Sequence, residues 1–163
     1  MTQEGLRLRG AKIIIHQWVK VRPWDNVLIV TGKDHMAEAQ ILKAVAQEKA
    51  KKVTILVVEK TGIHVGVFFD DNEEVFDPYS VVIAATEYSL VTTKAAKRAI
   101  NKRKKFLSLP LSTNDGRTML EYDFLMMDTK KSRLMAKVIM KYLHHSTKLR
   151  VTTPAGTNLR LSK

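Results

Sequence analysis

Four short, continuously apolar runs alternate with amphipathic stretches along most of the chain. The runs cover residues 27–31, 53–58, 81–86 and 106–109. Unbroken runs of Val, Ile, Leu and Ala are typical of strands that are buried on both faces of a parallel sheet. The amphipathic stretches between them supply the helical crossovers that parallel neighbours need. The pattern therefore predicts a Rossmann-like three-layer α/β sandwich with a four-stranded parallel sheet.

Apolar residues at three- and four-residue spacing predict the helices. One helix face is formed by Ala11, Ile14, Ile15, Trp18 and Val19. Pro23 is expected to end this helix, and residues 21–25 form the connector. A second helix is predicted over 35–49, with Asp34 as N-cap and with inward-facing Ala37, Ile41, Ala44 and Val45. A third covers 90–102. A long helix follows Asp123, its expected cap, with an apolar stripe of Leu134, Met135, Val138, Ile139, Tyr142 and Leu143.

The segment between the second and third runs has a weaker pattern. Residues 63–69 alternate weakly, as in a short strand, and residues 70–74 form either an acidic surface turn or the start of a helix. This acidic cluster lacks the spacing and the distal Glu of a calcium-binding loop.

A β-hairpin is predicted at the C-terminal end, from residues 149–152 and 158–162 around Pro154-Ala155-Gly156. A two-stranded hairpin is marginally stable alone. It therefore either packs on the preceding domain or begins a further one. We accordingly divide the chain into a Rossmann-like domain, 1–148, and a terminal hairpin, 149–163, which is either part of that domain or the start of a further one.

Composition narrows the class of protein. The 163 residues suit one domain, and no apolar run is long enough to span a membrane. The N-terminus has no signal-peptide pattern, so a cytoplasmic protein without membrane contact is expected. The chain contains no cysteine, which excludes disulfides, thiolate zinc sites and a Cys nucleophile.

Positive charge is concentrated in the second half. Residues 1–93 carry 11 Lys and Arg against 12 Asp and Glu, whereas residues 94–163 carry 17 against 4. A nucleic-acid surface is one interpretation, on a face bearing Lys97, Arg98, Lys102, Arg103, Lys104 and Lys105. The other is that these cations only solvate helices, because no aromatic or Gly interleaving of the RNA-binding kind accompanies them.

A ligand crevice is expected beyond the C-terminal ends of the strands if the strand order is 2-1-3-4. The loops after the first and third strands would then form it, and helix N-termini there favour a small anion. The candidate ligand-binding residues are Lys33, Thr86, Ser89, Thr92 and Thr93. The alternative is that the hydroxyl residues are ordinary helix caps.

Recognisable catalytic motifs are missing. The first strand is followed by Thr-Gly-Lys-Asp-His, which is neither a dinucleotide fingerprint nor a P-loop. The adjacent pair His144-His145 points in directions about 100° apart on a helix, which does not suit one metal. We therefore predict no catalytic residue and no metal ligand within this chain.

Three stretches in fixed order carry a family resemblance. They are residues 21–31, which contain Arg22-Pro23-Trp24-Asp25; residues 79–99, which contain Thr86-Glu87-Tyr88-Ser89; and residues 107–159, which end with Thr153-Pro154-Ala155-Gly156-Thr157-Asn158-Leu159. Together they resemble the N-terminal domain of the thermophilic leucyl aminopeptidase (aminopeptidase T-like) metallopeptidases. The resemblance covers nearly the whole chain.

The resemblance implies a metal-dependent exopeptidase, usually a dimer, with zinc, cobalt or manganese held by a C-terminal domain. None of those ligands transfers to a position in this chain, so no peptidase activity is expected from it alone. The expected partners are a second copy or the missing domain. The alternatives are a small-anion or nucleotide-binding module and a basic nucleic-acid binder.

Overall fold

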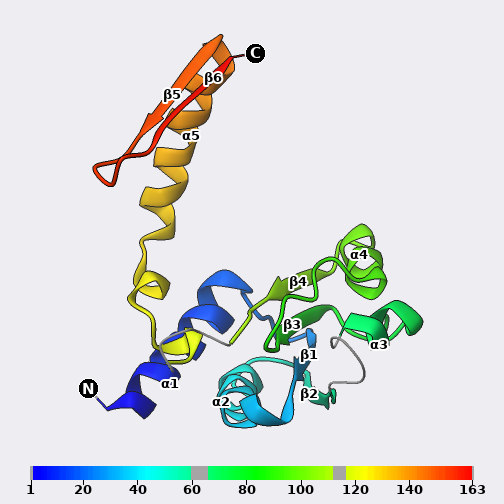
Figure 1. Cartoon of the computed structure of the whole chain (residues 1–163). Helices are drawn as coiled ribbons and strands as arrows, with labels where there is room; N and C mark the ends of the chain where they lie inside the picture. The colour runs from blue at the N-terminus through cyan, green and yellow to red at the C-terminus, as the bar shows by residue number, and fades with distance from the viewer. Residues whose placement is uncertain (1, 60–65, 112–116, 163) are drawn as a thin grey trace. The chain divides into compact units, whose positions relative to one another are not determined.

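The four apolar runs form one parallel sheet in the computed structural model, which describes residues 2–59, 66–111 and 117–162 (Figure 1). The strands are β1 (Asn26–Thr31), β2 (Lys52–Val57), β3 (Val81–Ala85) and β4 (Lys105–Ser108). Their order is β2-β1-β3-β4, and every neighbouring pair is parallel. This confirms the predicted sheet and its strand order.

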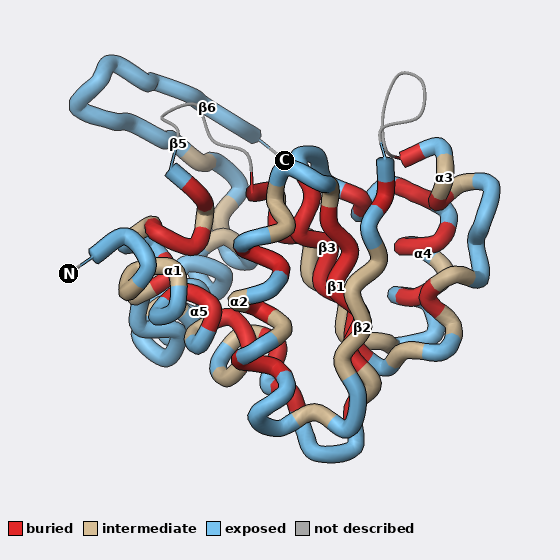
Figure 2. The backbone as a smooth tube through the Cα atoms, turned by 90° about the horizontal axis from the view of Figure 1, so that it is seen from below, coloured by how far each residue is buried: buried red, intermediate tan, exposed pale blue. Residues whose placement is uncertain are grey.

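Helices cover both faces of the sheet, so the fold has three layers. On one face Val27 and Ile29 of β1 pack into a core with α1 (Gln3–Ile13) and α2 (Met36–Gln47). On the other face Leu28 and Val30 pack with α3 (Gly66–Asp71) and α4 (Lys94–Asn101). Alternate residues of a strand point to opposite faces, so one apolar run fills both cores. Figure 2 shows β1 and β3 buried between the two helix pairs.

The first predicted helix face is confirmed. α1 begins after its N-cap Thr2 and continues as a π-helical turn, η1 (Ile14–Trp18), and Ala11, Ile14, Ile15 and Val19 are buried. The helical region stops at Val19, before Pro23, because Lys20 takes a left-handed conformation with φ of 53°. Two 3-10 helices, η3 (Met119–Glu121) and η4 (Asp123–Met126), pack along α1.

The structure corrects the predicted details of the second helix. A 3-10 turn, η2 (Lys33–His35), precedes α2, whose N-cap is His35 and not Asp34. Ala37 and Ala44 are exposed, whereas the buried positions are Glu38, Ala39, Leu42, Val45 and Ala46. Eight of the twelve residues 36–47 are apolar. The spacing of apolar residues therefore did not single out one face of this helix.

Three other local predictions differ from the structure. Residues 66–71 form the helix α3 and not part of a strand, and residues 63–65 lie outside the described residues. α4 begins at Lys94, four residues later than predicted, because Thr93 is its N-cap. The cap of the long helix α5 (Thr129–His145) is Asp128 and not Asp123, which lies in η4.

The chain divides into two compact units, Met1–Met126 and Met127–Lys163. The second, which we call unit 2, contains α5 and the antiparallel hairpin of β5 (Lys148–Thr152) and β6 (Asn158–Ser162). Gly156 completes the hairpin turn with φ of 99°. This division lies before α5, whereas the sequence placed the boundary after it, at residue 148.

Candidate functional site

The expected crevice is present at the C-terminal edge of the sheet. A cavity of about 250 Å³ opens there, between the segments that follow β1, β2 and β3. Its described lining consists of Gly32, Lys33, Asp34, His35, Val58, Glu59, Thr86 and Glu87. Strand order 2-1-3-4 therefore located the cavity correctly, as expected at the switch point of an open α/β sheet.

Lys33 and Glu59 form an ion pair at the mouth of the crevice. The hydrogen bond from Lys33 lowers the pKa of Glu59, and the same bond raises the pKa of Lys33. Both side chains are mostly exposed, so water and salt screen the pair. Sequence reasoning missed Glu59, because its contact with Lys33 exists only once β2 pairs with β1.

The hydroxyl residues proposed for the crevice mostly serve the local fold. Thr86 lines the cavity, but its Oγ1 donates to the Tyr88 carbonyl at 2.6 Å. Thr93 caps α4: its Oγ1 accepts from the Ala96 amide at 3.3 Å and donates to the Leu90 carbonyl at 2.7 Å. Ser89 pairs with Ser108 at 2.9 Å between their hydroxyls.

Of the five predicted residues, Lys33 and Thr86 belong to the described lining of the crevice, and Ser89, Thr92 and Thr93 do not. The lining also carries three carboxylates, from Asp34, Glu59 and Glu87, against the one ammonium of Lys33. Such a charge balance favours a cationic or zwitterionic ligand over a free anion.

The basic face predicted on α4 is largely neutralised inside the protein. Arg98 and Lys102 both bind Asp77, with Nη2–Oδ2 and Nζ–Oδ2 distances of 2.9 and 2.8 Å. Arg98 also contacts Glu74 at 3.0 Å. The hydrogen bonds from Arg98 and Lys102 hold the pKa of Asp77 far below its ordinary value. These two cations are therefore committed to an internal cluster.

The other four basic residues of this region differ in the groups that they contact. Lys104 Nζ donates to the carbonyls of Asp77 and Tyr79, each at 2.7 Å. Lys105 contacts the buried carboxylate of Asp25 at 3.1 Å. Burial alone would raise the pKa of Asp25, but hydrogen bonds from the Arg22 amide, Lys105 and Ser80 outweigh it and lower that pKa. Of the six predicted nucleic-acid residues, Lys97 and Arg103 are exposed without a described carboxylate partner.

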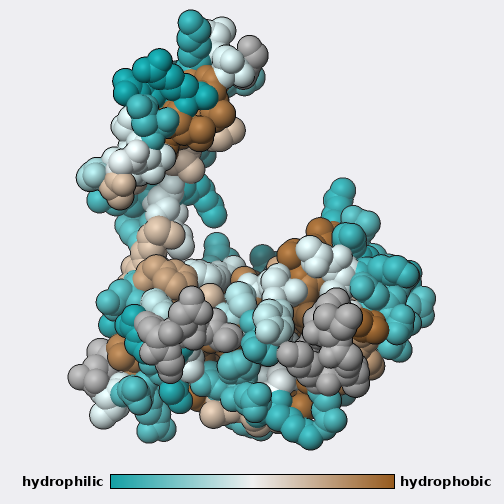
Figure 3. Space-filling model, viewed as in Figure 1, coloured by the Kyte–Doolittle hydropathy of each residue, from teal (hydrophilic) through white to brown (hydrophobic). Residues whose placement is uncertain are grey.

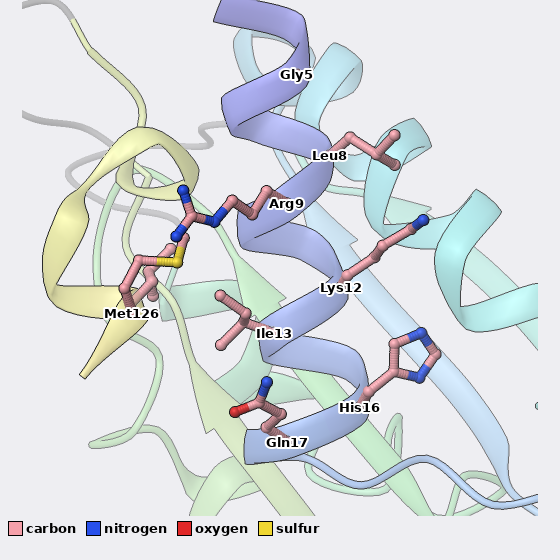
Figure 4. Close-up of a pocket in the computed structure, with 9 residues that line it drawn as sticks. Gly5, Leu8, Arg9, Lys12, Ile13, His16, Gln17 and Met126 are labelled. Atoms are coloured by element: carbon pink, nitrogen blue, oxygen red, sulfur yellow. The ribbon is translucent and has the colours of Figure 1, made fainter. Parts of the chain in front are cut away.

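A second concavity, of about 550 Å³, lies along α1. Figure 4 shows Arg9, Ile13 and Gln17 directed toward the segment around Met126, whereas Lys12 and His16 point to the opposite side of the helix. His16 packs near α2, with its Nε2 3.4 Å from Glu48 Oε2. The concavity is a shallow basic and apolar groove, and its described lining contains no carboxylate.

Unit 2 exposes its apolar side chains. The helix stripe of Leu134, Met135, Val138, Ile139, Met140 and Tyr142 is 50–70% exposed, and the hairpin adds Val151, Leu159 and Leu161. Figure 3 shows hydrophobic residues gathered on the surface of this unit. Between residues 127 and 162 no residue is buried. A contiguous exposed apolar surface is typical of an interaction site.

Metal-binding geometry is missing from the part of the chain that the structure describes. No group of three or more His, Asp or Glu side chains is placed there to hold a metal ion. The rings of His144 and His145 lie edge to face with centroids 5.4 Å apart.

Comparison with models of known protein families finds no match, and comparison with curated protein sequences also finds none. Within the described segments, no helix combines the length and the apolar character needed to cross a bilayer.

Proposed function

We propose that this chain is the N-terminal, non-catalytic part of a leucyl aminopeptidase-like metalloenzyme, and that it works together with a separate metal-binding portion. The order of the three sequence stretches that resemble this family supports the proposal. The Rossmann-like sheet and the terminal hairpin are the fold that the resemblance implies. The role of the chain is then to support and position a catalytic portion.

The observation that carries the proposal is the lack of any buried residue in unit 2 between residues 127 and 162. A single helix of 17 residues is marginally stable in water, and so is an isolated two-stranded hairpin. Burial of apolar side chains is the main term that would stabilise both. Unit 2 therefore needs a partner surface that covers its helix stripe and its hairpin.

The described residues do not offer a ligand set that fits a divalent metal ion. Metal-assisted peptide hydrolysis needs side chains that hold the ion while leaving a position open for water. The described segments offer no such set of His, Asp or Glu. We therefore assign the chain no step in peptide cleavage, and all of that chemistry belongs to the partner portion.

The test compares the recombinant 163-residue chain with the protein enriched from its native cells by an antibody against this chain. We expect the native material to release Leu from Leu-p-nitroanilide in a reaction that EDTA abolishes and zinc, cobalt or manganese restores. The recombinant chain should show neither turnover nor stoichiometric metal. Native material that has the mass of this chain alone and no peptidase activity would refute the proposal.

A second candidate function is the binding of a small ligand in the crevice. The cavity at Gly32, Lys33, Glu59 and Thr86 favours it, because this is where open α/β sheets bind their ligands. Its carboxylates lead us to expect that amino acids or amines, rather than phosphate or nucleotides, raise the melting temperature. A screen in which neither amines nor amino acids raise it would remove this candidate.

A further inference from the structure

The net positive charge of the chain is concentrated in unit 2. Residues 127–163 carry nine Lys and Arg against one Asp. That one carboxylate, Asp128, already accepts from the Lys130 and Lys131 amides at 2.8 and 3.1 Å as the cap of α5. By contrast, Arg98 and Lys102 pair with Asp77 and Glu74 within the first unit. The excess of basic over acidic side chains is therefore larger in unit 2 than in the rest of the chain.

The helix of unit 2 has a basic side and an apolar side. Lys130, Arg133, Lys137 and Lys141 follow one another at spacings of three or four residues, which places them along one side of α5. Met135, Val138, Ile139 and Tyr142 lie on the other side, next to Lys131, whereas Leu134 and Met140 border the basic side. Among the described residues no carboxylate pairs with any of these four cations.

The hairpin repeats this division. Leu149 pairs with Leu161 and Val151 pairs with Leu159, which makes one face apolar. On the other face Arg150 lies directly opposite Arg160. Like charges directly opposite one another destabilise a strand pair. Arg150 donates to Asn158 Oδ1 at 3.0 Å, but no described carboxylate lies between the two guanidinium groups. An anion held there would remove the repulsion.

We propose that unit 2 docks on an acidic protein surface, an apolar groove bordered by carboxylates, and that one of those carboxylates binds between Arg150 and Arg160. This inference rests on the proposed function and adds the chemistry that the partner portion presents. A protein fits better than a nucleic acid because each basic face adjoins an apolar face that phosphates would leave uncovered. It fits better than a membrane because Tyr142 is the single aromatic residue in 127–163, whereas surface-bound helices favour Trp and Phe.

The variant that tests the inference is Arg160→Glu in the full chain. It places a carboxylate opposite Arg150, so the hairpin itself should be strengthened. The site for the partner's carboxylate is lost at the same time. Lys97→Glu is the matched control, because it makes the same change in charge at an exposed position of α4. Amide hydrogen exchange at Val151 and Leu159 verifies that the hairpin persists.

The probe is a labelled 20-residue helical peptide with leucines on one face and glutamates along both borders, followed by fluorescence anisotropy in 50 and 200 mM NaCl. We expect Arg160→Glu to weaken its binding about tenfold, as the loss of a charge-assisted hydrogen bond implies, and Lys97→Glu to leave it within about twofold. Poly-glutamate, a 20-base-pair DNA and vesicles with 30% phosphatidylserine should each bind more weakly than the peptide.

Three results would overturn the inference: no binding of the peptide, equal binding by Arg160→Glu and the unmodified chain, or tighter binding of DNA or vesicles than of the peptide. None of them depends on peptidase activity. The outcome is therefore separate from that of the Leu-p-nitroanilide experiment, and either proposal can fail alone.

Discussion

Gly10 shows how one residue fixes the packing of α1 against η3. A Cβ atom at this position would overlap the carbonyl oxygen of Leu120 and approach Leu125 Cδ1 to 3.0 Å. Gly to Ala inside a helix normally stabilises it by about 1 kcal/mol. Here the contact is with backbone, which cannot move aside cheaply, so we expect Gly10→Ala to destabilise the protein by about 1–3 kcal/mol.

Urea unfolding of Gly10→Ala, followed by tryptophan fluorescence, measures this change in the free energy of unfolding. Gly32→Ala is the control, because its Cβ would meet nothing within 4 Å and its φ is −90°. We expect it to remain within about 0.5 kcal/mol of the parent protein. A Gly10→Ala variant as stable as Gly32→Ala would show that α1 and η3 do not pack closely in solution.

Asp77 makes a pH-dependent contribution to stability. Its pKa is lowered in the folded protein by hydrogen bonds from Arg98 and Lys102, so the folded state favours the ionised form. The stabilisation is complete above the unfolded pKa of about 3.9 and is lost as the pH falls through the folded pKa. We expect Asp77→Asn to lower the melting temperature at pH 7, with a difference from the parent that begins to shrink below about pH 4.

Thermal unfolding of both proteins from pH 7 to pH 2 tests this expectation, with Glu73→Gln as the control. Among the described residues, Glu73 forms an ion pair with the exposed Lys94 at 3.6 Å and lies beyond hydrogen-bond distance of Arg98, so its loss should have little effect at any pH. A difference between Asp77→Asn and the parent that stays constant down to pH 2 would contradict the assignment.

At the scale of elements, the sequence predicted the strands better than the helices. All four strands lie within about one residue of their predicted ends, because unbroken apolar runs have a single interpretation in a sheet buried on both faces. The inward face of α2 was predicted in part: Val45 is buried and Ile41 packs against the core, whereas Ala37 and Ala44 are exposed. Glu38 is buried on this face because the guanidinium group of Arg7, which also binds Glu121, lies 3.8 Å from its carboxylate. Such pairing between distant segments leaves no local signal in the sequence.

For the crevice, the sequence predicted the position in the fold better than the individual lining residues. Its place follows from strand order, which is a property of elements, and Lys33 and Thr86 do line it. Sequence could not separate two roles for Ser89 and Thr93, because a hydroxyl before a helix can serve as a cap or as a ligand donor. Their hydrogen bonds to Ser108 and Ala96 assign them to the scaffold.

The start of α5 gives a test at this scale, because the sequence favoured Asp123 as its cap and the structure places Asp128 there. Asp128→Ala removes the bonds to the Lys130 and Lys131 amides and should cost about 0.5–2 kcal/mol of helix stability. Amide hydrogen exchange in the first turns of α5 should then be several-fold faster. Asp123→Ala should leave α5 unchanged, and the reverse pattern would restore the sequence-based assignment.

At the scale of the whole molecule, the two units differ in what stabilises them. The parallel sheet buries apolar side chains on both of its faces, whereas unit 2 buries none of its residues from 127 to 162. Local opening requires little free energy where few apolar contacts are lost. Binding of a partner to the folded form of unit 2 would raise that free energy by mass action. The stability of unit 2 should therefore report directly on occupancy of its apolar surface.

In hydrogen exchange of the full chain alone, we expect the protection factors of the β1 and β3 amides to be at least about a hundredfold higher than those of α5 and the hairpin. The difference arises because the central strands exchange only through global unfolding, while a 17-residue helix and a hairpin open on their own. Protein enriched from native cells should show higher protection in unit 2 and the same protection in the sheet. Mass spectrometry of peptic fragments measures both. Equal protection of the two units in the isolated chain would mean that unit 2 is already covered by a surface of this same chain, and the need for a partner would disappear.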